Sequence, residues 1–369
     1  MTTMNSNTLT IVIRADSSQQ MGSGHVMRCL TLADELRQRG AQVLFICREL
    51  PGNLINLIEE KGYQVLRLQR PGAEYCAIPD DVAHSAWLGV SWEQDVVDTI
   101  NELPVETPQW LIIDHYAIDS RWEEKLRPQV GKIMVIDDLA DRQHDCDLLL
   151  DQNLYEGMES RYNNLVHESC NKLLGSKYAL LRPEFTIARK NLRQRDGVVK
   201  RILVFFGGVD PTNETEKALQ ALASISDRQF EVDVVVGCGN RHKKRIKKIC
   251  VENDAFHYHC QVNNMAELMV AANLAIGAGG STTWERCSLG LPALVIALAE
   301  NQVNIAQSAD NAGVLKCLGK LSEITSEVLL QQISTTIASE VILNTMSEKA
   351  LNLVDGCGVL RVADNMVQL

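Results

Sequence analysis

The stretch LTIVIRADSSQQMGSGHVMRCLTLADELRQRGAQVLFIC, from Leu9 to Cys47, decides the fold. It begins with a continuous apolar run over 9–13, rich in β-branched residues, which is typical of a buried strand. Residues 24–39 follow with apolar side chains at helical spacing, and Gly40 ends the helix. A second apolar run over 41–47 predicts another strand. Strand, helix and strand in this order form the unit from which parallel sheets are built.

The same alternation continues along the chain. We expect further helices over 53–61 and 92–103. The further expected strands are 64–68, 110–113, 133–136, 148–150, 202–206, 232–236, 274–276 and 293–296. Their apolar runs are continuous rather than alternating, which is typical of parallel strands covered on both faces. The sequence therefore predicts an α/β protein.

The length of 369 residues is too great for one hydrophobic core, so two domains are expected. The alternation weakens between about 155 and 200 and then restarts, and 189–200 is charged enough to be a linker. We predict one Rossmann-like domain over 1–190 and a second over 200–345. A C-terminal segment over 346–369 remains, and packing back on the first domain is one expectation for it. Residues 71–90 are interpreted as a loop.

Composition excludes several classes of protein. The net charge of −11 makes a general nucleic-acid binder a poor interpretation, because phosphates require Lys and Arg. The single basic run, 241–248, has helical spacing and is interpreted as a solvated helix face rather than a binding patch. The eleven cysteines form no CxxC pair, which favours reduced thiols. Neither a signal peptide nor a membrane-spanning run is recognisable, so we expect a cytoplasmic protein.

The first candidate site follows the strand over 9–13. Asp16 lies three residues after it, and Gly22, Gly24 and His25 lead into the next helix. Glycines allow close approach of a ligand to the backbone, and a histidine at this place can act as a base near neutral pH. The alternative is a tight turn with a capping histidine. The motif is not the dinucleotide fingerprint, because GxGxxG is absent.

The second candidate site is Asp114-His115-Tyr116, after the strand over 110–113. Three polar side chains stand there where parallel sheets bind ligands, beyond the carboxyl ends of strands. The alternative is that Asp114 caps a turn and the other two lie at the surface. Asp137 and Asp138 follow another strand, and we interpret them as caps before a polar loop.

The third candidate site is the string over 277–285, in which glycines lead from a strand into a helix. Free N–H groups at Gly280, Ser281 and Thr282 could hold a pyrophosphate, and Glu285 could accept hydrogen bonds from ribose hydroxyls. Further along, 300–302 follows the next strand. The alternative is an ordinary turn with a capping box between Ser281 and Glu285.

One cluster resembles a metal site. His257, His259, Cys260 and Cys250 have the right side chains. However, the two histidines alternate with apolar residues over 256–260, as in a half-buried strand. We therefore predict no metal here, since zinc sites use two well-spaced ligand pairs.

The third string resembles the donor-binding region of GT-B glycosyltransferases, and in particular the lipid-linked N-acetylglucosaminyltransferase of peptidoglycan synthesis. The resemblance runs from 265–268 through Gly279-Gly280-Ser281-Thr282, Glu285, 290–292 and Gln302 to Gly313. It implies a GT-B fold, with two Rossmann-like domains whose parallel sheets face a central cleft.

Five motifs together resemble the UDP-sugar hydrolases of bacterial pseudaminic acid biosynthesis. They are Arg14-x-Asp16-Ser17-Ser18, Gly22-x-Gly24-His25, Asp114-His115-Tyr116, Tyr178-Ala179-Leu180-Leu181-Arg182 and Phe206-Gly207-Gly208-x-Asp210. That family cleaves UDP-2,4-diacetamido-2,4,6-trideoxy-beta-L-altropyranose with water, without a metal, and inverts the sugar. The chain departs from the expected pattern in its last 50 residues and in the long loop over 71–90.

The resemblance implies a role for each matching residue. His25 would be the general base on the attacking water, and no metal or cofactor would be needed. The expected substrate contacts are Asp16, Gly24, His115, Tyr116, Arg182, Gly280, Ser281, Thr282, Glu285, Asn301 and Gln302. The expected partner is the small-molecule UDP-sugar, with neither nucleic acid nor membrane, and the chain is expected as a monomer or weak homo-oligomer.

Two other functions stay open at this point. A GT-B glycosyltransferase would pass the sugar to an organic acceptor instead of water. A membrane-lipid acceptor would call for a basic or apolar patch on the first domain, and the first helices show none. A nucleotide-sugar sensor without catalysis would not need a base facing the sugar. Fold alone does not separate the three.

Overall fold

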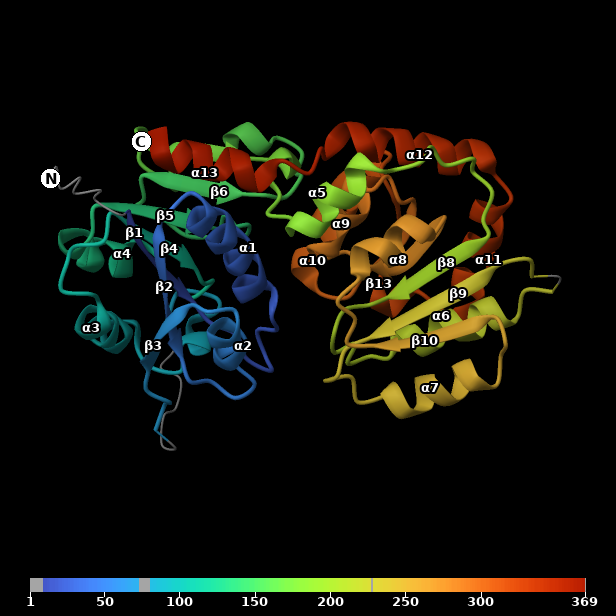
Figure 1. Ribbon diagram of the computed structural model, residues 1–369, viewed down its shortest axis with the longest axis horizontal. Coiled ribbons are helices and arrows are strands. Elements are labelled where there is room, and N and C mark those ends of the chain that lie inside the picture. Colours follow the sequence, from blue (N-terminus) through green and yellow to red (C-terminus); the bar gives the residue numbers. More distant parts are fainter. Residues whose placement is uncertain (1–8, 73–79, 227, 369) are drawn as a thin grey trace, which may run out of the picture. The chain divides into compact units, whose positions relative to one another are not determined.

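The structure, a computed structural model, describes residues 9–72, 80–226 and 228–368. The chain divides into two units (Figure 1). Unit 1 runs to Asn153 and includes Gly157–Leu180 and the C-terminal residues from Gly358 on. Unit 2 consists of Leu154–Glu156 and Leu181–Cys357. Of the C-terminal segment considered above, the part before Gly358 thus belongs to unit 2 and the rest to unit 1.

Unit 1 contains, within the described residues, a sheet of seven strands in the order β3-β2-β1-β4-β5-β6-β7. All neighbouring strands pair in parallel. The strands are β1 (Thr10–Ala15), β2 (Gln42–Arg48), β3 (Gln64–Leu68), β4 (Trp110–Asp114), β5 (Lys132–Ile136), β6 (Leu148–Asp151) and β7 (Asn171–Leu174). The helices are α1 (Gly24–Gln38), α2 (Ile55–Glu60), α3 (Trp92–Glu102), α4 (Ser120–Leu126) and α13 (Gly358–Gln368). Short 3₁₀ turns are η1 (Ser85–Leu88), η2 (Arg127–Gln129), η3 (Met158–Ser160) and η4 (Ser176–Tyr178).

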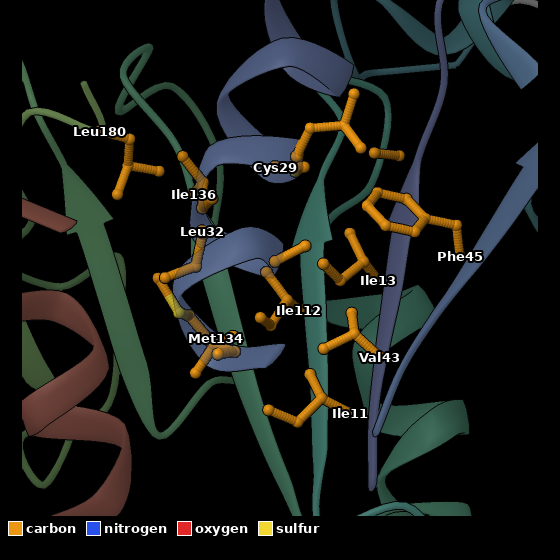
Figure 2. Close-up of a cluster of buried hydrophobic side chains, with 14 of the residues drawn as sticks. Ile11, Ile13, Cys29, Leu32, Val43, Phe45, Ile112, Met134, Ile136 and Leu180 are labelled. Carbon is orange, nitrogen blue, oxygen red and sulfur yellow. The ribbon is translucent and has the colours of Figure 1, made fainter. Parts of the chain in front are cut away.

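The sheet of unit 1 is covered on both faces because its strands are apolar on both sides. Successive strand residues point to opposite faces, so Ile11 and Ile13 pack on one side and Val12 on the other. The first side packs against α1 and α13, and Figure 2 shows Cys29 and Leu32 beside the strand residues. The second side packs against α3 and α4. The predicted class of α/β fold with parallel strands is confirmed.

Unit 2 contains, within the described residues, a parallel sheet of six strands in the order β10-β9-β8-β11-β12-β13. The strands are β8 (Arg201–Phe205), β9 (Glu231–Val236), β10 (Phe256–Cys260), β11 (Leu274–Ala278), β12 (Ala293–Ala297) and β13 (Lys316–Lys320). The helices are α5 (Pro183–Lys190), α6 (Glu214–Ala223), α7 (Lys243–Val251), α8 (Met265–Ala271), α9 (Thr282–Ser288), α10 (Glu300–Asn311), α11 (Ser326–Ile337) and α12 (Glu340–Leu353), with a 3₁₀ turn η5 (Leu321–Glu323).

In both sheets the direction of the strand order reverses at the first strand of the unit, β1 or β8. The next two strands in sequence lie on one side of this strand, and all later strands lie on its other side. Ligands of such sheets bind beyond the carboxyl ends of the strands near this point. The residues after β1, β4, β8 and β11 are therefore the places to examine.

The structure contains strands and helices that the sequence did not predict. It also supports the interpretation of the basic run as part of a helix. Strands β7 and β13 and helices α5, α11, α12 and α13 were not expected. Residues 243–248 of the basic run lie in α7, as the helical spacing suggested, and Arg241 and His242 precede the helix. The loop expected over 71–90 contains η1, while 73–79 lie outside the described residues. In the described part of the chain, none of the helices has the length and apolar character needed to cross a membrane.

Candidate active site

His25 and Asp114 form a hydrogen-bonded pair where β1, β4 and α1 meet. Asp114 is the last residue of β4, and His25 is the second residue of α1. Their atoms Nδ1 and Oδ1 lie 2.5 Å apart, and His25 is 7% exposed. With the carboxylate accepting from Nδ1–H, the lone pair of the imidazole lies on Nε2. Within the described residues Nε2 has no hydrogen-bond partner, so it is available to accept a proton.

Arg28 holds Asp114 from the next turn of α1. Its Nε and Nη2 donate to the two carboxylate oxygens at 2.6 and 2.7 Å. Burial raises the pKa of Asp114, but the charge of Arg28 and the hydrogen bonds from Arg28 and His25 outweigh it and keep the pKa well below its usual range. Asp114 therefore stays ionised and keeps the imidazole in one orientation. Sequence reasoning missed Arg28, although an arginine three residues after a candidate base, on the same helix face, is a usable signal.

Asp138 extends this cluster to the end of β5. It accepts hydrogen bonds from Arg28 Nη1 at 3.3 Å, from Asn153 Nδ2 at 2.9 Å and from the hydroxyl of Tyr116. Burial and the charge of Asp138 raise the pKa of the Tyr116 phenol, so the hydroxyl remains a donor. Asp138 was interpreted from the sequence as a turn cap, and these contacts connect it in addition to the side chains around His25. Asp137 does cap, by accepting from the backbone of Ala140 at 2.9 Å.

Asp16 and His115 lie in a second buried cluster. Asp16 accepts from the backbone N–H of Arg48 at 2.6 Å and forms an ion pair with Arg14 at 2.8 Å. His115 accepts from the backbone N–H of Ala117 through Nδ1, and its Nε2 lies 3.5 Å from Asp16. Burial lowers the pKa of His115. Asp16 is 1% and His115 2% exposed, so their contact with substrate stays a prediction. Asp114, not Asp16, is the carboxylate on His25.

Gly22 and Gly24 keep the approach to His25 open. Gly22 has φ +78°, a backbone conformation that favours glycine. A Cβ at Gly24 would have no atom within 4 Å, so glycine leaves free space directly before the histidine.

In unit 2, glycines stand near the end of β11 and in the turn that leads from β11 into α9. A Cβ at Gly277 would overlap the backbone oxygen of Phe205 on β8. Buried Arg286 holds the turn by donating to Ala278 O at 2.9 Å and to Thr283 Oγ1 at 3.1 Å. Burial lowers the pKa of Arg286 to about 10, so it is charged at neutral pH. Sequence reasoning did not single out this arginine.

The predicted pyrophosphate residues lie on this turn. No hydrogen bond within the described residues uses the backbone N–H groups of Gly280, Ser281 and Thr282. The alternative of a capping box is not observed, because the Ser281 side chain makes no capping hydrogen bond. Glu285 lies 3.3 Å from Arg182 Nη2. Burial raises the pKa of Glu285, and the charge of Arg182 only partly offsets this.

The two predicted contacts on α10 differ in position. Gln302 accepts from the backbone N–H of Leu298 at 3.0 Å, and its Nε2 is 3.8 Å from where a Cβ on Gly280 would be. It therefore lies beside the turn. Asn301 is exposed at the start of α10. The structure thus brings Gly280, Ser281, Thr282, Glu285, Arg182 and Gln302 into one neighbourhood of unit 2.

The histidines that resembled metal ligands lie on β10 and contact carboxylates. His257 is 2.5 Å from Glu231, and His259 is 2.8 Å from Asp233. Among residues 9–72, 80–226 and 228–368, no three His, Cys, Asp or Glu side chains are grouped so that they could hold a metal ion. The interpretation of 256–260 as a strand is confirmed.

Comparison with known structures defines the class of the fold. The crystal structure of MurG from Acinetobacter baumannii aligns with a TM-score of 0.65 at 16% identity, over 98% of this chain and 100% of that chain. The fold is that of the GT-B glycosyltransferases, as predicted. The predicted cleft depends on how the two units are placed and stays a prediction.

Sequence comparison then connects the chain with particular proteins. Residues 202–357 match the glycosyltransferase family 28 C-terminal domain. The chain is 28% identical to the UDP-2,4-diacetamido-2,4,6-trideoxy-beta-L-altropyranose hydrolase of Campylobacter jejuni, over 80% of this chain and 94% of that protein. It is 29% identical to an uncharacterized protein of Methanocaldococcus jannaschii over 78% of this chain, but the match spans only 55% of the length of that protein.

Proposed function

We propose that the protein hydrolyses UDP-2,4-diacetamido-2,4,6-trideoxy-beta-L-altropyranose to UDP and the free sugar, a step of pseudaminic acid biosynthesis. The observation that carries the proposal is the His25–Asp114 pair, whose Nε2 is left without a partner among the described residues. The similarity to the Campylobacter jejuni hydrolase over most of both chains supports the choice of reaction and substrate.

The proposed reaction is a direct displacement at the anomeric carbon. The oxygen of water forms a bond to this carbon, and the bond from carbon to the β-phosphate oxygen breaks. The electron pair of that bond leaves with UDP, and a water proton passes to Nε2 of His25. Asp114 orients the ring and stabilises the imidazolium that forms. Attack opposite the leaving group inverts the configuration of the sugar.

We assign recognition of UDP to unit 2. The amides of Gly280, Ser281 and Thr282 have free hydrogen atoms to offer to phosphate oxygens, as is common at such turns. Glu285 would accept from the ribose hydroxyls. UDP is a good leaving group, and these amides can stabilise its growing charge, so we propose that no metal is required. Arg182, Asn301 and Gln302 remain further proposed contacts.

A second candidate function is transfer of the sugar to an organic acceptor. The match of residues 202–357 to a glycosyltransferase domain favours transfer, because transferases and the proposed hydrolase would bind the same kind of UDP-sugar donor. The two functions differ in one respect that can be measured, since a transferase needs its acceptor and a hydrolase needs only water.

The test is phosphorus NMR of the full chain with the UDP-sugar in buffered water, with chelator present and no acceptor added. We expect steady conversion of the UDP-sugar signals into those of UDP. Intact substrate under conditions where binding is demonstrated by calorimetry would favour the transferase. Turnover that stops with chelator and resumes with a divalent cation would contradict the proposed metal independence.

A further inference from the structure

We infer that His84 and Trp87 form an aromatic subsite beside His25 that binds the apolar, deoxygenated side of the sugar. The inference rests on the proposed function and deepens it, because it assigns the selection of the sugar to particular side chains. Both residues belong to unit 1, on the segment before and within η1, in the region interpreted from the sequence only as a loop.

Four rings lie together at this place. The ring of Tyr116 meets the imidazole of His25 edge to face, with centroids 4.6 Å apart. The ring of Trp87 stacks near Tyr116 at 5.8 Å and meets His25 edge-on at 6.4 Å. His84 lies 4.4 Å from Trp87 and 5.5 Å from Tyr116. Tyr116 is buried, whereas His84 and Trp87 are half-buried, so the outer pair has ring surface left for a ligand.

The position of the base determines which part of the substrate these rings meet. A water held by Nε2 of His25 lies about 3 Å from it, and the anomeric carbon lies about 3–3.5 Å further. The sugar ring must therefore lie within one water of the imidazole. Trp87 and Tyr116 flank the same imidazole at 6.4 and 4.6 Å, so they border the same space. The uridine is separated from the anomeric carbon by two phosphates, so it is too far along the substrate to be the group that meets them.

The chemistry of the rings favours a sugar with few hydroxyls. The hydroxyl of Tyr116 already donates to Asp138, so its hydrogen is not available to a hydroxyl group of the sugar. Burial lowers the pKa of His84, which keeps its imidazole neutral beside Trp87 at neutral pH. Aromatic faces bind C–H and methyl groups well and leave hydroxyls without partners. A trideoxy sugar with two acetamido groups supplies a methyl group at carbon 6 and two acetyl methyls.

Trp87 also contacts the edge of the hydrophobic core that packs against α3 and α4, and so does Trp92. Trp92 is half-buried as well, but it lies under Arg121 and takes no part in the ring cluster at His25. The two tryptophans therefore form a matched pair. A purely structural role would make them equivalent, whereas a sugar subsite requires only Trp87.

The test measures the binding of UDP-sugar and of UDP by calorimetry in full-length His25→Ala protein, which prevents turnover. We expect Trp87→Leu in this background to weaken UDP-sugar binding roughly tenfold, in line with the worth of an aromatic contact, and to leave UDP binding unchanged. Trp92→Leu should change neither affinity, and Trp87→Phe should retain most of the UDP-sugar affinity.

Each other outcome has a definite meaning. A folded Trp87→Leu protein with an unchanged ratio of UDP-sugar to UDP affinity would overturn the subsite. Equal losses for both ligands, or equal effects of Trp87→Leu and Trp92→Leu, would show a structural role and overturn it as well. Failure of the His25→Ala parent to bind UDP-sugar at all would contradict the proposed function itself, which is a separate result.

Discussion

Asp114 is contacted by Arg28 and by His25, and this arrangement determines what His25 can do. Arg28 occupies both carboxylate oxygens, and His25 shares one of them. Because this environment keeps the pKa of Asp114 low, the carboxylate does not take the proton from the imidazole. Asp114 therefore orients His25, and the proton taken from water stays on the ring until it is released.

The first prediction concerns the proposed base. His25→Ala should lower kcat by roughly 10²–10⁴-fold, the usual contribution of a positioned general base. KM for the UDP-sugar should change little, because the proposed binding groups are residues other than His25. Steady-state kinetics of UDP release measures both constants. The control is His167→Ala, an exposed histidine whose described hydrogen bonds are to Ser169, and near-normal turnover in His25→Ala would refute the assignment.

The second prediction concerns Asp151, at the end of β6. Burial and the nearby charge of Asp138 raise the pKa of its carboxyl to about 7, against about 4 in the unfolded chain. Between these pH values the native state binds more protons than the unfolded state. The contribution of Asp151 to the free energy of unfolding is therefore largest below pH 4 and falls as the pH rises to 7. The contribution lost is up to about 4 kcal/mol.

The effect is measured by urea unfolding of the wild type and of Asp151→Asn at several pH values between roughly 4.5 and 8. The free energy of unfolding should fall with pH more steeply in the wild type than in Asp151→Asn. Parallel curves for the two proteins would contradict the raised pKa.

The sequence predicted the residues of the site that stand where a strand leads into the next helix, and missed two that lie further along. Asp114 ends β4, and His25 opens the helix that follows β1, so their positions beyond the carboxyl ends of parallel strands indicated them. Arg28 lies within the helix α1, where an arginine is a common residue and does not by itself indicate a site. Trp87 lies in a segment without periodicity, and only the tertiary contact with Tyr116 reveals its position.

At the level of elements, β11 contains a packing glycine, Gly277, and the turn that follows it contains Gly280, whose amide has no partner among the described residues. The third prediction separates them. Gly277→Ala should cost about 1–3 kcal/mol of stability, because its Cβ overlaps the backbone of β8. Gly280→Ala should leave stability nearly unchanged, since its Cβ comes no closer than 3.8 Å to Gln302.

Calorimetry with UDP provides the second half of this comparison. Gly280→Ala should weaken UDP binding by about tenfold, since the methyl group would stand between the amides and a phosphate. Unchanged UDP affinity in Gly280→Ala would show that this turn is not the phosphate site. Thermal unfolding of both variants separates loss of binding from loss of fold.

Central strands were predictable from the sequence and two edge strands were not. Strands such as β1 and β11 are buried on both faces, which requires continuous apolar runs. β7 and β13 lie at sheet edges and are only partly buried, so their sequences NKLL and KCLGK carry polar residues and no clear signal. α13 carries Val359, Val362, Ala363 and Met366 at helical spacing, so the helix itself could have been predicted, whereas its place in unit 1 depends on contacts across more than 300 residues.

At the level of the whole molecule, the chain returns at its C-terminal end to the unit in which it begins. α13 packs on the sheet face that also holds α1, and Asp364 forms an ion pair with Arg39 at 2.6 Å. Met366, 2% exposed, belongs to this core, whereas Val367 on the same helix is 65% exposed. Unit 1 is therefore incomplete without α13.

The fourth prediction tests this arrangement. Met366→Ala should lower the stability of unit 1 by about 2–5 kcal/mol, and Val367→Ala should change it by less than about 0.5 kcal/mol. Hydrogen exchange should show faster exchange in α1 of the Met366→Ala protein and unchanged exchange in α6 of unit 2. Faster exchange confined to unit 2 would contradict the assignment of α13 to unit 1.

The central claim is that water, activated by His25, attacks the anomeric carbon of the UDP-sugar. The most direct measurement is turnover in ¹⁸O-enriched water with no acceptor, followed by mass spectrometry of both products. The account predicts ¹⁸O in the anomeric hydroxyl group of the released sugar, before exchange with solvent, and unlabelled UDP. Label in the β-phosphate of UDP would show attack at phosphorus, and that result would contradict the account.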